Sequence, residues 1–215
     1  MNFYNQIITL LNEHNQSIKN VSRALEIDTI SIFFDKRYKL ERLNKLGFWH
    51  KIKRDNTLYP KLEKRLTTKQ ITSAFQLEEY PIYYTNQPDY PKYNKAILVM
   101  FGLSQYHKSA PPTNLIEQII KILKNISSID ICYDFDQKPN IDRLKEYYKV
   151  TQYQDTYYIN NTYELMIEKI CIYDKSNKNG LNFNVYRFEA TITIPNPKVL
   201  NLPLYEVNKI LELVI

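Results

Sequence analysis

The chain has 215 residues, of which 44% are hydrophobic and 24% charged, and this composition indicates an ordinary folded protein and excludes wholesale disorder. Its longest apolar run, 96–101, is far shorter than the roughly 20 residues that span a bilayer, and its start shows no basic, cleavable leader, so we expect no membrane segment and no signal peptide. The two cysteines, Cys132 and Cys171, both lie in apolar runs, which excludes a disulfide scaffold and favours a reducing cytoplasm.

The net charge of +6 is concentrated in residues 45–69, because this segment has eight basic and two acidic residues while the remainder is balanced. Three aromatic residues, Phe48, Trp49 and Tyr59, are interleaved with the cations. Cations with aromatic rings suit a nucleic acid, whose phosphates attract charge and whose bases stack. A lysine-rich solvated helix is the alternative. The candidate DNA-binding residues are Lys45, Lys51, Lys53, Arg54, Lys61, Lys64, Arg65 and Lys69.

The N-terminal part, 1–90, is predicted to be helical and basic. Apolar spacing predicts a helix over 3–13, a second helix after Ser17 and a third from about residue 28. The spacing over 17–36 is compatible with a helix-turn-helix, although Glu26 stands where the turn glycine is usual. Three plainly packed helices are the alternative. Helical or mixed segments are expected over 40–49 and 58–75, and a loop or edge hairpin over 80–95 is the expected boundary.

Residues 91–215 show a different pattern. Strands are expected over 96–101, 128–135, 156–159, 165–173 and 183–194, with helices over 111–123, 139–148 and 204–214 and a turn over 176–180. No internal repeat is evident in the sequence. This order predicts an α+β fold with a largely antiparallel sheet.

Strand alternation places several charged residues on one face of this sheet. Asp130 and Asp134 point opposite to the apolar residues of their strand, and Arg187 and Glu189 do the same in the last strand. If 169–175 follows the same rule, Tyr173 and Lys175 join them. One interpretation is a carboxylate cluster that holds Mg²⁺ or Mn²⁺, with a tyrosine beside it. The other is a solvated face with cross-strand Asp–Arg pairs.

In order, the segments Ile129–Asp134, Thr156–Ile159, Ile172–Lys175 and Val185–Glu189 resemble motifs of the trans-acting rolling-circle replication initiator family of plasmids and some filamentous phages. The resemblance covers about residues 95–195. It implies a five-stranded antiparallel sheet with flanking helices and a metal-dependent, site-specific nick in one DNA strand. In this reaction a tyrosine becomes linked to the 5′-phosphate, and the freed 3′-OH primes synthesis.

By position, the resemblance assigns Asp130, Asp134 and Glu189 to the metal and Lys175 and Arg187 to catalysis. The nucleophile stays open among three tyrosines. Tyr186 matches by its place beside Arg187, strand alternation favours Tyr173, and Tyr205 lies one helical turn before Lys209. The resemblance further implies origin DNA, duplex and single-stranded, as partner, and its partners can include a host helicase and a second copy of the chain.

These observations predict a cytoplasmic replication initiator that nicks and rejoins DNA. The first alternative is a non-catalytic DNA-binding regulator of plasmid or phage replication on the same fold. A protein with neither activity, whose acids are merely solvated, is the second. Related initiators with a His-hydrophobic-His metal motif are disfavoured, because His14, His50 and His107 form no such pair.

Overall fold

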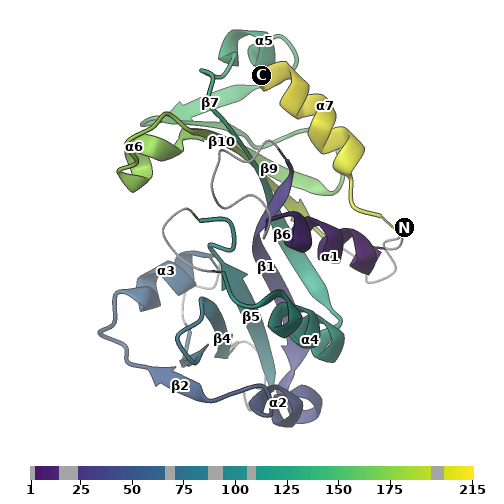
Figure 1. Ribbon diagram of the computed structural model, residues 1–215, viewed down its shortest axis with the longest axis vertical. Helices are drawn as coiled ribbons and strands as arrows, with labels where there is room; N and C mark the ends of the chain where they lie inside the picture. The colour runs from purple at the N-terminus through teal and green to yellow at the C-terminus, as the bar shows by residue number, and fades with distance from the viewer. Residues whose placement is uncertain (1–2, 15–23, 66–70, 87–93, 106–109, 195–200) are drawn as a thin grey trace. The chain divides into compact units, whose positions relative to one another are not determined.

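The computed structural model describes residues 3–14, 24–65, 71–86, 94–105, 110–194 and 201–215 (Figure 1). These residues form seven helices and ten strands. The helices are α1 (Phe3–His14), α2 (Lys36–Asn44), α3 (Leu58–Arg65), α4 (Thr113–Leu123), α5 (Ile141–Lys145), α6 (Lys175–Asn179) and α7 (Leu204–Val214). The strands are β1 (Glu26–Asp35), β2 (Trp49–Ile52), β3 (Ala74–Leu77), β4 (Ile82–Asn86), β5 (Lys95–Phe101), β6 (Ile126–Phe135), β7 (Val150–Tyr153), β8 (Thr156–Ile159), β9 (Ile167–Asp174) and β10 (Tyr186–Thr193).

The fold is α+β, as predicted, but the antiparallel sheet has ten described strands and not five. Hydrogen-bonded neighbours follow the order β2-β3-β4-β5-β1-β6-β10-β9-β8-β7. The chain divides into two compact units. We call residues 29–127 the middle unit and residues 1–28 with 128–215 the split unit. This division differs from the boundary expected near residue 90.

The two units repeat one strand topology. In the middle unit β1 pairs with β5, and β4, β3 and β2 follow in that order. In the split unit β6 pairs with β10, and β9, β8 and β7 follow. In both, a helix follows the first strand (α2 or α5) and another follows the last strand (α4 or α7). The repeat lies in the topology, which is why a search for similar residues at a fixed spacing does not find it.

The expected helix-turn-helix over 17–36 is wrong where the structure describes it. Residues 24–25 are not helical, and Glu26–Asp35 is the strand β1. Residues 17–23 lie outside the described part of the chain. Ile27, Thr29, Ile30 and Ile32 are β-branched, which favours a strand. Because the first five residues of β1 are all buried, the two-residue alternation that identifies a strand is missing there.

The other expected helices of the N-terminal part are mixed with strands. Residues 49–52 form β2 and residues 74–77 form β3, while α3 occupies 58–65. Pro60 lies in the first turn of α3, where no backbone donor is required, so it does not break the helix. The Asn56 side chain accepts a hydrogen bond of 2.9 Å from the Leu58 N–H at the start of this helix. β4 is an interior strand between β3 and β5 and not an edge hairpin.

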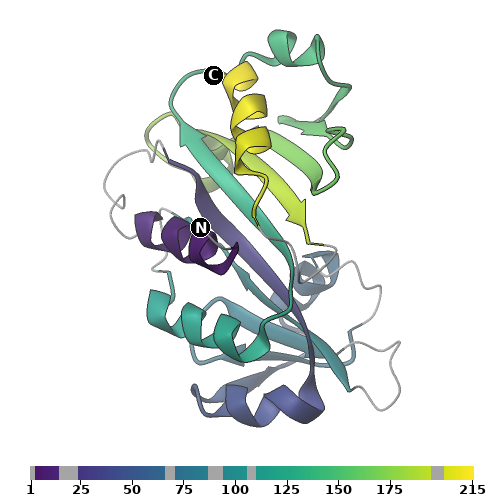
Figure 2. The ribbon, with the colours of Figure 1, turned by 90° about the vertical axis from the view of Figure 1, so that its right-hand side faces the viewer.

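The middle unit has a hydrophobic core that includes part of the basic segment. Tyr59 and Leu62 of α3 are buried with Ile52, Val99 and Tyr83. α2 and α4 lie side by side in this unit (Figure 2). Burial of each large side chain of such a core contributes roughly 1.5–3 kcal/mol.

The split unit contains the elements that were predicted best. β8 and α7 have the predicted bounds, β6 and β9 lie within two residues of theirs, and β10 begins three residues later than predicted and ends one residue earlier. One face of the strands buries Ile131, Phe188 and Ile172, while α7 buries Val207 and Ile210. No helix in the described ranges is long and apolar enough to cross a membrane.

Candidate functional site

Strand pairing in the split unit places the predicted polar residues on one face. Cys132 of β6 and Cys171 of β9 both face Glu189 of β10. Likewise, Asp134 and Tyr173 both face Arg187 in the register. We call this surface the polar face; on the three strands it carries Asp130, Cys132, Asp134, Lys169, Cys171, Tyr173, Arg187, Glu189 and Thr191.

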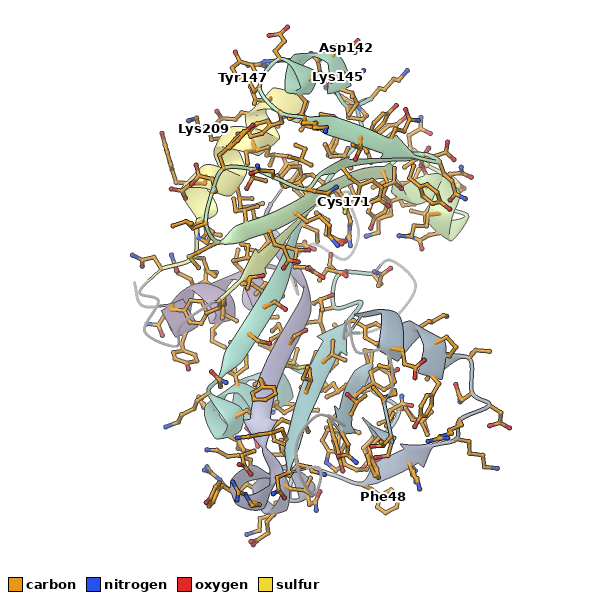
Figure 3. The ribbon with its side chains drawn as sticks, turned by 180° about the vertical axis from the view of Figure 1, so that it is seen from behind. Phe48, Asp142, Lys145, Tyr147, Cys171 and Lys209 are labelled. Atoms are coloured by element: carbon orange, nitrogen blue, oxygen red, sulfur yellow. The ribbon has the colours of Figure 1, made fainter. Side chains whose placement is uncertain are left out.

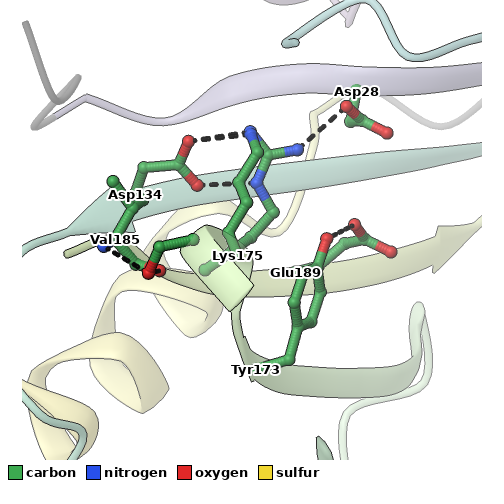
Figure 4. Close-up of polar contacts among 8 residues, drawn as sticks. Asp28, Asp134, Tyr173, Lys175, Val185 and Glu189 are labelled. Atoms are coloured by element: carbon green, nitrogen blue, oxygen red, sulfur yellow. Dashed lines mark hydrogen bonds and ion pairs between the residues drawn. The ribbon is translucent and has the colours of Figure 1, made fainter. Parts of the chain in front are cut away.

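The centre of the polar face is a buried network of four charged residues (Figure 4). Arg187 Nε donates to Asp134 Oδ1 at 2.6 Å, and its Nη2 donates to Oδ2 at 2.8 Å. Its Nη1 donates to Asp28 Oδ1 at 2.9 Å. Lys175 Nζ donates to Asp134 Oδ2 at 3.1 Å. The Arg187 side chain has no exposed surface and that of Lys175 only 1%, so neither can touch a bulky substrate in this conformation.

The charges of this network balance, because it contains two cations and two carboxylates. Burial by itself would raise the pKa of the Asp134 carboxyl, but Arg187 and Lys175 outweigh it, and the pKa lies below its ordinary value. Burial, together with the charge of Arg187, lowers the pKa of the Lys175 ammonium. A buried ion pair offsets its desolvation cost when its geometry is good, as in the bidentate pair of Arg187 and Asp134. The network therefore holds the strands β6 and β10 in register at this point.

Lys175 reaches this network from the start of α6. Asp174 caps α6, since its carboxylate accepts from the Asn177 N–H at 2.9 Å. The Lys175 N–H donates to the Val185 carbonyl at 2.8 Å, which ties the start of α6 to the residue just before β10. The segment 176–180 that was predicted as a turn is thus most of a short helix, ended by Gly180 at φ 62°.

Tyr173 and Glu189 form a hydrogen-bonded pair on the polar face. The Tyr173 hydroxyl donates to Glu189 Oε2 at 3.3 Å (Figure 4). Both side chains are half-buried. Burial, and next the charge of Glu189, raise the pKa of the Tyr173 hydroxyl above its ordinary value. Tyr173 is therefore protonated at neutral pH, and the carboxylate beside it is the group placed to accept its proton.

An exposed cation lies over this tyrosine. Lys178 of α6 places its Nζ 4.2 Å from the centre of the Tyr173 ring. Its ammonium is exposed, unlike that of Lys175. Lys178 is thus an exposed cation beside Tyr173, whereas Lys175 and Arg187, which the resemblance assigns to catalysis, are buried.

The three predicted metal ligands are engaged differently. Both oxygens of Asp134 accept from Arg187 or Lys175, so a divalent cation there would lie beside two positive charges. Asp130 Oδ1 accepts from the Thr191 hydroxyl at 2.8 Å. Within the described ranges, no group of three or more His, Cys, Asp and Glu side chains is placed to hold a metal. The arrangement does not fit a site made of Asp130, Asp134 and Glu189, and a metal requirement stays a prediction for the assay below.

The other two candidate nucleophiles lie elsewhere. Tyr186 faces Phe135 across β6 and β10, with ring centres 6.0 Å apart, so it is on the opposite face from Glu189. The bulge between β9 and β10 falls at 191–192 and does not turn Tyr186 around. Tyr205 is 77% exposed on α7.

The two cysteines are apolar fillers on the polar face. Both are buried on either side of Glu189, and Figure 3 shows Cys171 within the sheet of the split unit. Burial raises the pKa of the Cys171 thiol to about 12 and also raises that of Cys132. Neither is a thiolate at neutral pH, so neither is a ready nucleophile.

The segment predicted to bind nucleic acid lies in the middle unit. Lys45, Lys51, Lys53, Arg54 and Lys61 are exposed, while Lys64 and Arg65 belong to α3 and Lys69 lies outside the described residues. Of the interleaved aromatics, Tyr59 is buried in the core and the Trp49 indole N–H donates to the Leu43 carbonyl at 3.3 Å. Phe48 is 65% exposed, and although its ring meets the His50 ring edge-on with centres 4.6 Å apart, it keeps surface on which a base can stack (Figure 3).

Acidic residues lie close to part of this basic surface. A hollow of about 410 Å³ is lined by Lys51 and Lys53 and also by Asp55, Glu78 and Glu79. Glu78 and Glu79 lie outside 45–69, so the charge count of that segment does not include them. The positive surface is therefore interrupted here, and Lys45, Arg54 and Lys61 lie outside the hollow.

Sequence reasoning missed two residues of the site. Asp28 was assigned to a helix, so its ion pair with Arg187 was not expected. An aspartate among β-branched residues is itself unusual and was the available signal. Lys178 was assigned to a turn, and nothing in the sequence places it over Tyr173.

No protein-family model matches the chain, and no curated protein matches it.

Proposed function

We propose that the protein nicks and rejoins one DNA strand with Tyr173 as its nucleophile. The observation that carries this proposal is the hydrogen bond from the Tyr173 hydroxyl to Glu189, 3.3 Å long, on a face that also holds an exposed ammonium, Lys178. A nucleophile, a base within hydrogen-bond reach and a cation for the phosphate are the parts that this transfer needs. The resemblance to rolling-circle initiators supports the same choice of reaction.

In the proposed step, the Tyr173 oxygen attacks the phosphorus of a phosphodiester while Glu189 accepts the hydroxyl proton. The new bond joins the tyrosine to the 5′-phosphate. The bond from phosphorus to the 3′-oxygen breaks, and that oxygen takes a proton from water and leaves as a 3′-OH. The reverse step rejoins the strand. Lys178 neutralises the developing charge on the phosphate.

Arg187, Asp134, Lys175 and Asp28 are positioning residues in this proposal. They are buried, so they act by fixing β6, β10 and the start of α6, the elements that carry Glu189 and Lys178. A variant of the network is therefore expected to lose stability together with activity. The exposed lysines of the middle unit are proposed to hold the rest of the DNA.

The test is an incubation of the whole protein with supercoiled plasmid and single-stranded oligonucleotides, with and without Mn²⁺. A denaturing gel and mass spectrometry then detect a tyrosyl-DNA adduct. We expect an adduct on Tyr173 that Tyr173→Phe abolishes, that Tyr186→Phe and Tyr205→Phe retain, and that Glu189→Gln forms about 10²-fold more slowly or worse. An adduct on another tyrosine would overturn the assignment.

A DNA-binding regulator without catalysis is the second candidate. The exposed cations of the middle unit favour it independently of Tyr173. It predicts salt-sensitive DNA binding with no adduct under any metal condition. Protein that neither binds DNA nor forms an adduct would contradict both candidates.

A further inference from the structure

A pocket of about 250 Å³ opens in the split unit next to Tyr173. Its walls come from four strands, from the segment before and into α5, and from α6. Its polar and aromatic lining includes Lys138, Gln152, Asp155, Tyr157, Asn177 and Tyr186, and Tyr173 also lines it. None of them belongs to the ion-pair network of the polar face.

Strand register shows which side chains share the face of the sheet below this pocket. Gln152 faces Tyr157, and Tyr157 faces Ile172. Tyr186 faces Asp174, two residues on from Ile172. The side chains of all five residues therefore lie on the face of the sheet opposite to Glu189: Gln152, Tyr157, Ile172, Asp174 and Tyr186. Tyr173 lies between Ile172 and Asp174 in β9. The pocket and the proposed nucleophile share this stretch of β9.

The chemistry of the walls suits one flat heterocycle. Tyr157 and Tyr186 offer aromatic surfaces, while the Gln152 and Asn177 amides and the Asp155 carboxylate offer polar groups for its edge. The volume is below the roughly 300–1,000 Å³ typical of sites for larger organic ligands, so one ring system is the fitting size. Lys138 is exposed and lines the pocket, where an ammonium suits a phosphate attached to that ring system.

We propose that this pocket binds one unpaired base of the DNA strand that Tyr173 cleaves, an inference that rests on the proposed function. The base stacks against Tyr157 and Tyr186, and Lys138 contacts its phosphate. The Asp155 carboxylate accepts from an exocyclic amino group, so cytosine, adenine and guanine are preferred to thymine. Tyr186 is then a wall of the base pocket.

The first experiment measures the affinity of the whole protein for a labelled single strand of about twelve nucleotides by fluorescence anisotropy, with one abasic site moved along the strand. One abasic position is expected to weaken binding about tenfold. Tyr186→Ala should weaken binding of the intact strand by about the same factor and remove the effect of that abasic position. Tyr205→Ala, an exposed tyrosine on α7, serves as the control and should change neither.

Base preference provides a second readout that does not depend on how well Tyr186→Ala folds. Asp155 is exposed, so Asp155→Asn should fold normally. At the position found by the abasic scan, the wild type should bind thymine several-fold more weakly than cytosine. Asp155→Asn should remove most of that difference because an amide can also donate to a thymine carbonyl.

The outcomes separate this inference from the proposed function. If the Tyr173 adduct forms but no abasic position and no base matters, the pocket proposal is wrong and the nicking proposal stands. If one base position depends on Tyr186 and Asp155 while no adduct forms, the pocket proposal stands and the nicking proposal is wrong. An adduct on Tyr186 would overturn both.

Discussion

At the scale of single residues, the arginine of the polar face is a fully buried cation. Arg187 has no exposed surface and donates hydrogen bonds to two carboxylates, Asp134 and Asp28. Only a planar guanidinium can reach both oxygens of Asp134 and a second acid in this way. Its role is therefore structural first, and any effect on chemistry passes through Glu189, two residues along β10.

We expect Arg187→Met to lower the free energy of unfolding by about 3–5 kcal/mol, because the substitution removes the guanidinium that donates to the buried carboxylates of Asp134 and Asp28. Urea unfolding measures the loss. The matched control is Lys145→Gln, which removes an exposed partner of Asp142 at 3.2 Å and should change stability by no more than about 0.5 kcal/mol. Equal effects of the two substitutions would show that the network does not stabilise the fold.

The shifted pKa of Asp134 gives a pH prediction. Since the folded-state pKa lies below the ordinary value of 3.8, the folded state holds this proton less tightly than the unfolded chain does. The resulting stability is complete well above pH 4 and is lost as pH falls through the folded-state pKa. Asp134→Asn lacks this contribution, so the stability difference between wild type and variant should shrink from pH 6 to pH 3. A difference that stays constant over this range in urea unfolding would contradict the assignment.

At the scale of elements, sequence predicted strands well where one face of the sheet is buried and the other polar. β6 and β10 alternate in this way, so their presence and the sharing of a face by Asp134, Arg187 and Glu189 followed from the residues, although β10 begins three residues after its predicted start. β1 could not be recognised, because its first half is buried on both faces and its apolar residues do not alternate. Because Asp28 lies in β1, its ion pair with Arg187 could not be predicted either.

The depth of burial also could not be predicted. Cross-strand Asp–Arg pairing was one of the two interpretations of the polar face, and the structure contains such a pair. That interpretation expected a solvated surface, whereas Arg187 and Asp134 are buried. Alternation gives the face of a side chain, but the partners that it meets there come from segments distant in sequence, here Asp28 of β1 and Lys175 at the start of α6.

Two helix ends provide a matched test of backbone conformation. Lys124, after α4, has φ 64°, and Gly180, after α6, has φ 62°. Glycine adopts this left-handed conformation without strain, whereas other residues do so at a cost of about 1 kcal/mol. We therefore expect Lys124→Gly to raise the free energy of unfolding by about 0.5–1 kcal/mol and Gly180→Ala to lower it by about 1 kcal/mol. If urea unfolding showed that both substitutions change the free energy of unfolding in the same direction, the argument would be contradicted.

At the scale of the whole molecule, one topology is used twice with different surfaces. In each unit the first and last strands pair through oppositely charged residues: Asp35 with Lys95 at 3.1 Å in the middle unit, and Asp134 with Arg187 in the split unit. The first pair is partly exposed and the second is buried. The split unit carries the tyrosine and the carboxylate, and the middle unit carries the excess of exposed cations, so the repeat separates the proposed chemistry from the proposed DNA binding.

This separation predicts which cations determine the salt dependence of DNA affinity. Each phosphate contact contributes about 0.9 to the slope of log affinity against log salt concentration for duplex DNA. Replacing Lys51, Lys53 and Arg54 with Gln should lower the slope by up to about 2.7 if all three contact phosphates. The control replaces Lys145, Lys149 and Lys209 of the split unit, all exposed, with Gln. It makes the same change in net charge and should leave the slope within about one contact of the wild type. Equal slopes for the two triple variants would show that DNA responds to net charge alone and not to the basic surface of the middle unit.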